Sequence, residues 1–333
     1  MKIWKVMSVL VVIALLYYII RNINLMEIWV LVKQLNPLFL SLAILSYLAA
    51  FLVFNIRTIY AFSDIIKKPN FFFFLRVLFA GFFINIITPG MQIGGEPLRA
   101  HYIGKKYGKP TSKAFGIVLG DRFFHALVSI FFIFISVLFI LTFISVSNEL
   151  RVLFQAIFFF ILGFFVLLAL LNIKKTNSFI TPLFGKIVSL KFFKKNFTKK
   201  FLSGKITKGM GSFKDSFKKT ISTRRIIVSG ISLSVVYWLL NYLVNYFLFL
   251  SLGSKVGLLT IIVAVSIGGI VSDFSPSPGG LGLVEGSIAF AYTLLGIDFQ
   301  IALTVAILSR MILYFYSLLI GGLSLLSLNH SLR

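Results

Sequence analysis

Long apolar runs separated by short basic segments are the feature that most constrains this chain. A helix rises about 1.5 Å per residue, so roughly 20 apolar residues cross the hydrocarbon core of a bilayer. Six runs suit this role, at residues 4–20, 37–62, 114–146, 152–172, 226–251 and 299–328. Hydrophobic residues make up 59% of the 333 residues, more than a soluble protein can hide. The sequence therefore predicts an all-α polytopic membrane protein, with one integral membrane domain over residues 1–333.

Two breaks rich in proline and glycine interrupt this apolar sequence. The first runs from Thr88 to Arg99 and the second from Asp273 to Gly286, and each holds a Gly-Gly pair and a carboxylate. Broken backbone at membrane depth leaves polar groups that only protein or a water-filled cavity can cover. The breaks therefore predict a polar site inside the membrane. The residues expected to break the helices are Pro89 and Gly90 in the first and Pro276 and Pro278 in the second, while the Gly-Gly pairs, Gly94-Gly95 and Gly279-Gly280, are candidates for substrate binding.

The distribution of Lys and Arg predicts how the chain crosses the membrane, because cytoplasmic loops carry the excess of these residues. The net charge is +24, and only the stretch 71–98 separates the basic loop at residues 67–68 from the basic segment 99–113. If both are cytoplasmic, 71–98 enters and leaves on one side, as a re-entrant hairpin with its break at the tip. The same argument makes 256–296 a second hairpin, which enters from the opposite face.

The order span, hairpin, span then occurs twice, over 37–146 and over 226–328, with opposite orientation. The sequence thus predicts about six full spans and two re-entrant hairpins in an inverted repeat, an architecture that transporters use to build a site near the midplane. We expect the protein in the cell membrane with both termini cytoplasmic, and the first run as a retained helix, because no small-residue cleavage site follows it. A plain eight-span protein is the alternative, although it would place four lysines outside.

A basic segment, residues 173–225, separates a first half, 1–172, from a second half, 226–333. It holds 15 Lys and Arg residues against one acid, Asp215. Phenylalanines recur among the lysines mostly at every fourth position, which is the spacing of a basic amphipathic helix in the membrane interface. A plain solvated linker is the alternative. In both cases the segment is expected to be cytoplasmic and to face anionic lipid, and no motif indicates nucleic-acid binding.

The first break offers a candidate anion site. Glu96 and Arg99 lie three residues apart, so they can pair on one turn of a helix. Alternatively, Arg99 and the exposed amides near Gly94 and Gly95 bind the phosphate of a lipid headgroup. Asn85, before the break, is a candidate for satisfying freed backbone, and the other interpretation is that it lines the site.

Further charged residues lie inside the apolar runs. Asp121 and Arg122 form either a salt bridge to a neighbouring helix or a substrate contact. Arg310 lies near the middle of its run with Tyr314 one turn later, and a single buried arginine needs a partner. The candidate partners are Asp121, Asp273, Glu285 and a lipid phosphate. Asp273 can also cap the turn that follows it, and Gly279 and Gly280 allow the backbone to approach a phosphate.

Known catalytic and metal-binding patterns are absent from the sequence. His101, His125 and His330 have no metal-ligand spacing, there is no cysteine, and no nucleotide-binding glycine loop is present. We therefore expect a protein that is not an enzyme and needs no metal or other cofactor. The expected partners are membrane lipids with anionic headgroups, a cytosolic lipid-modifying enzyme and a second copy of the chain.

Four stretches carry a family resemblance, and their order covers essentially the whole chain. They are residues 85–90 with 94–100, Gly120-Asp121-Arg122, residues 275–282 with Glu285-Gly286, and Arg310 with Tyr314. Together they resemble the signatures of the lysylphosphatidylglycerol synthase transmembrane-region family, also called flippase-like domain proteins. Asp121 departs from this pattern, because the family usually has Glu at that position.

The resemblance implies a lipid-translocating membrane part. In the multiple peptide resistance factors, the better-understood relatives, this region is implied to flip aminoacylated phosphatidylglycerol, while a separate soluble domain makes that lipid. The only soluble stretch here is the basic segment, so no synthase domain is expected. The main hypothesis is a flippase for an anionic phospholipid or a polyprenyl-phosphate-linked lipid. The rivals are an intramembrane transferase, and a membrane partner that recruits a cytosolic lipid-modifying enzyme.

Overall fold

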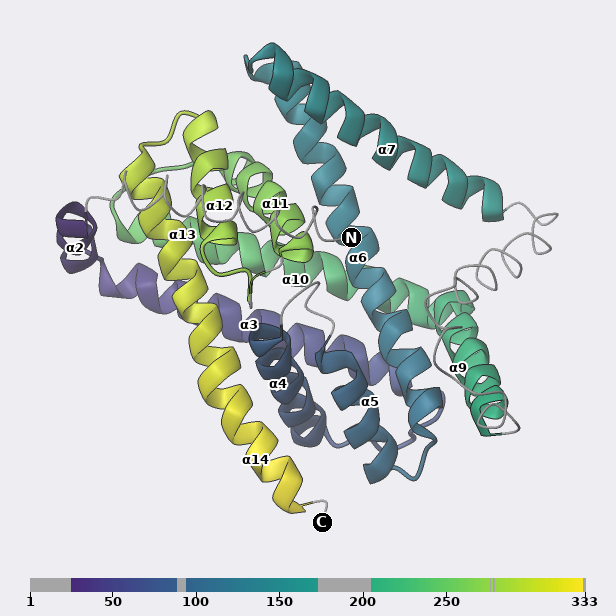
Figure 1. Cartoon of the computed structure of the whole chain (residues 1–333). Helices are drawn as coiled ribbons and strands as arrows, with labels where there is room; N and C mark the ends of the chain where they lie inside the picture. Colours follow the sequence, from purple (N-terminus) through teal and green to yellow (C-terminus); the bar gives the residue numbers. More distant parts are fainter. Residues whose placement is uncertain (1–24, 89–93, 173–204, 276, 278, 332–333) are drawn as a thin grey trace, which may run out of the picture.

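The computed structural model describes residues 25–88, 94–172, 205–275, 277 and 279–331, and this part of the chain is helical without any strand (Figure 1). The predicted span 4–20 lies outside the described residues, as do Pro89, Gly90, Pro276 and Pro278. In chain order the helices are α2 (Leu25–Lys33), α3 (Pro37–Phe62), α4 (Phe71–Ile87), α5 (Gly95–Lys106), α6 (Thr111–Phe143), α7 (Asn148–Asn172), α9 (Lys205–Ser222), α10 (Arg224–Ser251), α11 (Leu258–Phe274), α12 (Leu283–Leu294), α13 (Phe299–Tyr314), the π-helix η1 (Phe315–Ile320) and α14 (Gly321–Ser331).

Five helices in the described part of the chain are long and apolar enough to cross a membrane. They are α3, α6, α7 as far as Val166, α10, and the continuous rod of α13, η1 and α14. Each corresponds to one of the predicted spans, so the all-helical, multi-pass membrane class is confirmed. Helices α4, α11 and α12 are apolar but shorter, with 17, 17 and 12 residues.

Polar residues next to the apolar runs determine where several helices begin. The Asn36 side chain accepts a hydrogen bond from the Leu38 amide at 3.0 Å, directly before the proline that opens α3. Asn70 caps α4 in the same way, and Asp298 caps α13. Such caps satisfy backbone amides that have no partner inside the helix.

Three predicted boundaries differ from the structure. The first hairpin was predicted to end at residue 98, but its return arm α5 runs on to Lys106, because Arg99 is buried within the fold instead of ending the arm. Helix α7 begins at Asn148 and not at residue 152; an acid in its first turn, Glu149, suits a helix N-terminus. Only Thr223 separates α9 from α10, so the second half begins inside the predicted linker.

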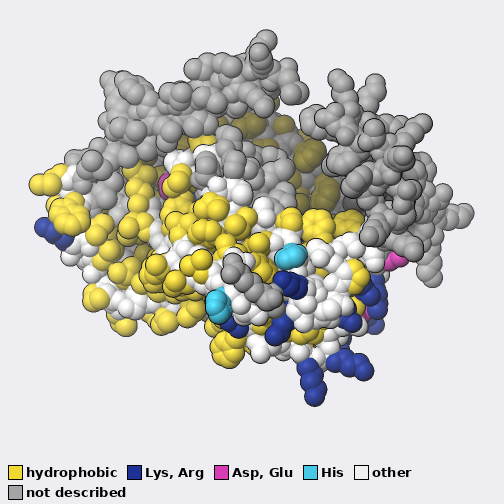
Figure 2. Space-filling view, turned by 60° about the horizontal axis from the view of Figure 1, so that its bottom comes forward, with side chains coloured by type: hydrophobic (Ala, Val, Ile, Leu, Met, Phe, Trp, Pro, Cys, Tyr) yellow, Lys and Arg dark blue, Asp and Glu magenta, His cyan; other side chains and the backbone are white. Residues whose placement is uncertain are grey.

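One end of the molecule, which we name the basic end, carries the loops 63–70 and 107–110 and the end of α14. The Asn70 amide donates to the Tyr107 hydroxyl at 2.8 Å, and Arg76 donates to Ser327 at 3.1 Å. Figure 2 shows the Lys and Arg side chains gathered on this face, which is the bottom of Figure 1. Helix α4 therefore begins at the basic end, and α5 ends at the same end.

The opposite end holds the start of α3 and the end of α10. The Asn36 amide donates to the carbonyl of Ser251 at 2.8 Å. Helices α3 and α10 therefore lie side by side and antiparallel through the centre of the molecule (Figure 1). Their buried aromatic side chains, including Phe51, Tyr242 and Phe249, form the largest apolar core together with residues of α12 and α13.

The four short helices form two pairs, α4 with α5 and α11 with α12. Gly95 of α5 approaches α4 so closely that a Cβ there would lie 2.1 Å from the carbonyl oxygen of Gly81. In the second pair, Gly268 of α11 lies against Ile288 of α12. The second turn reaches the end of α4, since a Cβ on Gly279 would lie 3.2 Å from Ile86. The two broken segments, distant in the sequence, thus meet inside the molecule (Figure 1).

Helix α9 occupies the last part of the predicted basic segment and packs along α6. Gly116 and Gly120 of α6 allow this contact, because a Cβ on Gly120 would lie 2.7 Å from Thr220. The exposed Lys219 forms an ion pair with Asp64 at 3.0 Å. The structure therefore has a helix in this segment, whereas the part of the segment at 173–204 lies outside the described residues.

Candidate functional site

A cavity of about 830 Å3 lies between the two helix pairs and the long helices α3, α6, α7, α10 and α13. Its charged lining, among the described side chains, consists of Glu96, Arg99, Arg122 and Arg310. Aromatic and aliphatic side chains make up most of the remaining wall. Cavities of this size, mainly apolar with a few convergent polar groups, are typical of small-molecule and cofactor sites.

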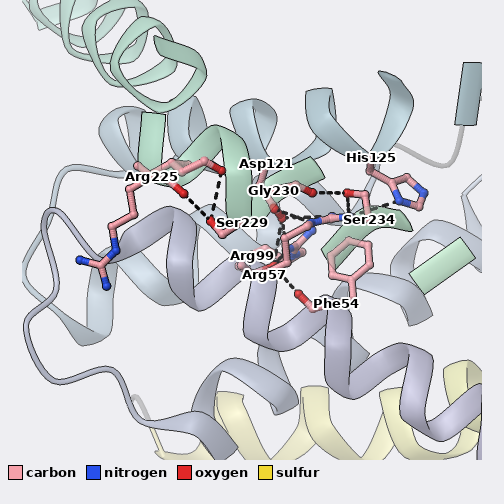
Figure 3. A network of polar contacts seen from close by, with 11 residues as sticks. Phe54, Arg57, Arg99, Asp121, His125, Arg225, Ser229, Gly230 and Ser234 are labelled. Carbon is pink, nitrogen blue, oxygen red and sulfur yellow. Dashed lines mark hydrogen bonds and ion pairs between the residues drawn. The ribbon is translucent and has the colours of Figure 1, made fainter. Parts of the chain in front are cut away.

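Arg57 of α3 and Asp121 of α6 form the central ion pair of the first charged cluster (Figure 3). The Arg57 Nε and Asp121 Oδ1 atoms are 2.7 Å apart, and each residue is 1% exposed. Arg57 Nη1 also donates to Ser234 of α10 at 2.9 Å and lies 3.3 Å from His125 Nδ1. Of the two predicted roles of Asp121, a salt bridge to a neighbouring helix is therefore the one observed.

Arg99 of α5 joins this cluster from the first helix pair. Its Nη2 donates to the Thr58 hydroxyl at 2.8 Å and lies 3.7 Å from Asp121 Oδ2, and Thr58 donates to the same oxygen at 3.0 Å. Gly81 makes room for this side chain, since a Cβ there would lie 2.8 Å from Arg99 Cδ. The guanidinium also lies over the Phe54 ring, 5.1 Å from its centroid, which favours a cation.

Glu96 pairs with Arg122 of α6, and not with Arg99 as the three-residue spacing suggested. The reason is that Arg99 turns toward Thr58 and Asp121, whereas Glu96 Oε1 meets the guanidinium of the neighbouring helix. The other carboxylate oxygen, Glu96 Oε2, is buried without a hydrogen-bond partner among the described residues. Arg122 is less enclosed, with its side chain 30% exposed.

Asn85 satisfies backbone that the first break leaves free, as predicted. Its side-chain oxygen accepts a hydrogen bond from the Gly95 amide at 2.6 Å. This bond joins the last turns of α4 to the first residue of α5, on the two sides of the break. Asn85 also lines the cavity.

The second charged cluster links α12 and α13 at the second break. Arg310 Nε lies 3.2 Å from Glu285 Oε1, and Arg310 Nη2 donates to the Tyr314 hydroxyl at 3.0 Å and to the carbonyl of Gly279. Of the predicted partners of Arg310, Glu285 is therefore the one observed. Tyr314 donates to the same Glu285 oxygen at 3.3 Å.

Glycines of the second break shape this cluster. Gly279, Gly280 and Gly282 have φ values of 60°, 74° and 80°, a region that suits residues without a Cβ. The Gly282 amide donates to Glu285 Oε2 at 2.8 Å, so this carboxylate also begins α12. A Cβ on Gly280 would lie 2.5 Å from Val284 Cγ2, so this glycine also lets the turn pack closely against the start of α12. The side chain of Asp273 lies outside what the structure describes.

The sequence did not indicate that Arg57, Thr58 and Ser234 belong to the first charged cluster. These residues lie on long helices and carry no local break or repeat that would mark them. The only available signal was that Arg57 is a charged residue near the end of an apolar run, and such a residue needs a partner. His125, which the histidine count set aside as a metal ligand, lines the cavity and stacks on Trp238 at 5.2 Å.

The arrangement is suited to holding an anion. The described side chains of the two clusters contain four arginines and three carboxylates, which leaves one net positive charge in a buried setting. Buried charge without compensation is costly, and an incoming phosphate would provide the missing negative charge. Within the described part of the chain, no group of three or more His, Asp or Glu side chains is placed to hold a metal ion.

Comparison with known proteins agrees with this membrane architecture. The model of the family described as "Lysylphosphatidylglycerol synthase TM region" matches residues 5–321. A UPF0104 membrane protein of Pyrococcus horikoshii is 26% identical over 303 residues, which cover 86% of each chain. Another, from Methanocaldococcus jannaschii, is 25% identical over 324 residues, with 96% of this chain and 94% of the relative covered.

A UPF0104 membrane protein of Methanothermobacter thermautotrophicus is similar as well, 24% identical over 284 residues, or 84% of this chain and 82% of the relative. The family match extends over both helix pairs, over four of the five described spans, and over the fifth as far as residue 321. The protein is thus a multi-pass membrane protein related to lipid metabolism. The chain belongs to the lysylphosphatidylglycerol synthase transmembrane-region family.

Proposed function

We propose that this protein translocates an anionic lipid, either a phospholipid or a polyprenyl-phosphate-linked lipid, across the membrane. The observation that carries the proposal is the cavity of about 830 Å3 among helices of membrane-spanning length, lined by three arginines, one each from α5, α6 and α13. Arginine suits phosphate because its planar guanidinium makes two parallel charge-assisted hydrogen bonds. The family name, which refers to a phospholipid-modifying protein, supports the choice of a lipid.

In this proposal Arg99, Arg122 and Arg310 bind the headgroup phosphate. Arg122 is the most accessible of the three and makes the first contact. Each arginine already has a carboxylate neighbour, which holds the arginine side chain in place before the lipid arrives. The same carboxylate competes with the lipid phosphate for the arginine, so the lipid is released readily afterwards. A site for transport needs this balance, because a phosphate bound too tightly would not leave.

The apolar side of the cavity provides a path for the lipid tails. Ala156, Ile157 and Phe160 of α7 line the cavity, and Phe160 is also 78% exposed on the outer surface. Helix α7 rests mainly on α6 and leaves most of its apolar surface uncovered. We propose that the headgroup enters the cavity beside α7 while the acyl or prenyl chains stay in the membrane.

We further propose that the two helix pairs are re-entrant hairpins of an inverted repeat. The α4–α5 pair begins and ends at the basic end, and the α11–α12 turn reaches down to α4 from the other side. Movement of one repeat against the other would then open the cavity to each side of the membrane in turn. The basic end would face the cytoplasm.

Reconstituted vesicles provide the test. Fluorescent phosphatidylglycerol or a short polyprenyl phosphate would be followed by its accessibility to an impermeant reductant or enzyme. Arg99→Gln and Arg310→Gln should each lower the translocation rate at least tenfold, whereas Arg151→Gln, an exposed arginine at the start of α7, should leave it unchanged. Equal rates for all four proteins, each shown to be folded, would overturn the headgroup role of the arginines.

The same experiment separates transport from catalysis. In our proposal the lipid crosses the membrane with all its covalent bonds unchanged. Mass spectrometry of the lipids after the assay should therefore recover only the starting lipid. A new lipid species formed by the wild-type protein, and absent with the folded Arg99→Gln variant, would favour an intramembrane transferase instead.

A further inference from the structure

An ion pair between a glutamate and an arginine joins the second helix of each short pair to the long helix that follows it in the chain. Glu96, in the first turn of α5, pairs with Arg122 of α6. Glu285, in the first turn of α12, pairs with Arg310 of α13. We call α5 and α12 the return arms, and Glu96–Arg122 and Glu285–Arg310 the return-arm ion pairs. The second ion pair repeats the first in the elements that it joins and in their order.

The two arginines occupy the same position in helices of equal length. Arg122 is the twelfth residue of α6, and Arg310 is the twelfth residue of the rod formed by α13, η1 and α14; each of these helices has 33 residues. They run in opposite directions, since α6 begins at the basic end and the rod ends there (Figure 1). Each arginine thus lies roughly 17 Å along its helix from a different end of the molecule. One return-arm ion pair is therefore nearer to the basic end, and the other is nearer to the opposite end.

The two ion pairs differ in how tightly they are enclosed. The Arg122 side chain is 30% exposed, and the Arg310 side chain is 10% exposed. Glu96 Oε2 has no hydrogen-bond partner among the described residues, whereas Glu285 Oε2 accepts from the Gly282 amide at 2.8 Å. The Glu96–Arg122 pair is thus the more open of the two in this structure. Such a difference between corresponding parts suits alternating access, in which one repeat moves against the other.

A phosphate can take the place of either glutamate. Carboxylate and phosphate oxygens both accept two parallel hydrogen bonds from a guanidinium group, and both bring negative charge. When a phosphate takes Arg122, the buried Glu96 carboxylate loses its cation, and the contact between α5 and α6 through this ion pair is lost. A buried charge without a partner is strongly unfavourable, so the return arm is favoured to move until water reaches the glutamate. The same reasoning applies to Glu285 and α12.

We infer that Glu96 and Glu285 are gating residues, one in each repeat, and that each return-arm ion pair closes the cavity on its own side of the membrane. Phosphate that arrives from the basic end displaces Glu96 from Arg122 while the Glu285–Arg310 pair stays closed. When the repeats exchange conformations, the Glu285–Arg310 pair opens toward the other side. Glu96 then returns to Arg122 as the lipid leaves. The two glutamates thereby couple lipid binding to movement of the repeats.

This inference rests on the proposed function, but labelling of a cavity cysteine tests it without any lipid. Ser129 of α6 lines the cavity, and the natural chain has no cysteine, so Ser129→Cys is a single target inside the cavity. In sealed vesicles with protein of known orientation, Glu96→Gln should make this thiol react at least about fivefold faster with an impermeant reagent added on the side of the basic end. Glu285→Gln should do the same for reagent added on the opposite side. Glu149→Gln, at an exposed position at the start of α7, should change neither rate.

The side from which labelling accelerates decides the outcome. Acceleration by both Gln variants from one side only, or by neither variant, would overturn the gating role. Glu96→Asp and Glu285→Asp keep the charge but reach less far, so they should change the rates in the same directions by smaller amounts, and they retain the test if a Gln variant does not fold. Loss of translocation by the wild-type protein would instead overturn the proposed function, and with it the role of lipid phosphate in opening the ion pairs.

Lipid binding tests whether phosphate competes with the glutamate. Purified Glu96→Gln in detergent should bind fluorescent phosphatidylglycerol about tenfold more tightly than wild type, because the competing carboxylate is gone. Its translocation rate should nevertheless fall, because no glutamate returns to displace the phosphate. Glu149→Gln should match the wild type in both measurements. Binding by folded Glu96→Gln that is no tighter than that of the wild type would contradict the competition and overturn the inference.

Discussion

At the scale of single residues, the most demanding feature is the fully buried pair of Arg57 and Asp121. Moving two charges out of water costs several kcal/mol per ion, so such a pair persists only with good geometry and further hydrogen bonds. Ser234 and Thr58 supply these bonds. The pair joins α3, α6 and α10, and through Thr58 it also holds Arg99 at the cavity.

Removing one member of this pair should therefore be far more harmful than removing an exposed arginine. Arg57→Gln leaves the Asp121 carboxylate buried beside Arg99 alone, and we expect a loss of about 3–5 kcal/mol in the free energy of unfolding. Arg224→Gln, at the exposed start of α10, should change this quantity by less than about 0.5 kcal/mol. Chemical unfolding of the purified protein in detergent measures both.

The double variant Arg57→Gln with Asp121→Asn distinguishes a coupled pair from two independent residues. We expect it to be more stable than the sum of the single variants predicts, by roughly 1–3 kcal/mol, because no lone charge remains buried. Additive losses would show that the two side chains act separately and would contradict the role assigned to this ion pair.

At the scale of helices, the packing of the first pair depends on the absence of side chains at two positions. Gly81 and Gly95 let α4 and α5 approach until backbone meets backbone. The sequence indicated that this region is broken, but the breaking residues alone did not show that Gly95 belongs to a helix contact. The sequence also did not show that Gly81, inside an apolar run, makes room for Arg99.

Gly95→Ala should force α4 and α5 apart. The new methyl group would lie 2.1 Å from the carbonyl oxygen of Gly81, and backbone cannot move aside as a flexible side chain can. We expect a loss of at least about 1–3 kcal/mol in unfolding free energy, together with impaired binding or transport of lipid. The matched control is Gly163→Ala in α7, where no atom lies within 4 Å of the new Cβ.

Helix propensity alone predicts that Gly95→Ala stabilises the protein, which is the opposite of the loss expected from the close contact. The comparison of Gly95→Ala with Gly163→Ala therefore separates the two effects. Alanine is favoured over glycine inside a helix by about 1 kcal/mol, so Gly163→Ala should be neutral or slightly stabilising. If Gly95→Ala were as well tolerated as Gly163→Ala, the close contact between α4 and α5 would not exist in the folded protein.

At the scale of the whole molecule, charge and contacts agree on which segments share an end. The loops 63–70 and 107–110 touch each other at the basic end, and the start of α3 meets the end of α10 at the other. An uninterrupted eight-span arrangement would separate the two basic loops by a full membrane crossing. The two arrangements therefore differ in which residues share an aqueous side.

Labelling of single cysteines decides between these arrangements. The natural chain has no cysteine, so each introduced thiol is the only target. We expect Lys68→Cys and Lys105→Cys to react with an impermeant maleimide from the same side of sealed vesicles, and Ser147→Cys and Lys255→Cys from the other. Reaction of Lys68→Cys and Lys105→Cys from different sides would show that α4 crosses the membrane completely and would contradict the hairpin.

The sequence by itself determined the class of protein and the positions of its main elements. Apolar runs of spanning length must form helices in a membrane, because no other open structure pairs its backbone polar groups there. Five of the six predicted spans correspond to described helices that are long and apolar enough to cross a membrane. The remaining one, residues 4–20, lies outside the described residues. Proline and glycine marked the two breaks, and Asn85 was correctly expected to satisfy freed backbone.

The tertiary structure alone decided which charges meet. Arg99 turns to Thr58 and Asp121 and leaves Glu96 to Arg122, and Arg57 enters the centre from a helix with no marked motif. Local spacing states which side chains can reach each other on one helix, whereas an ion pair between helices depends on how those helices pack.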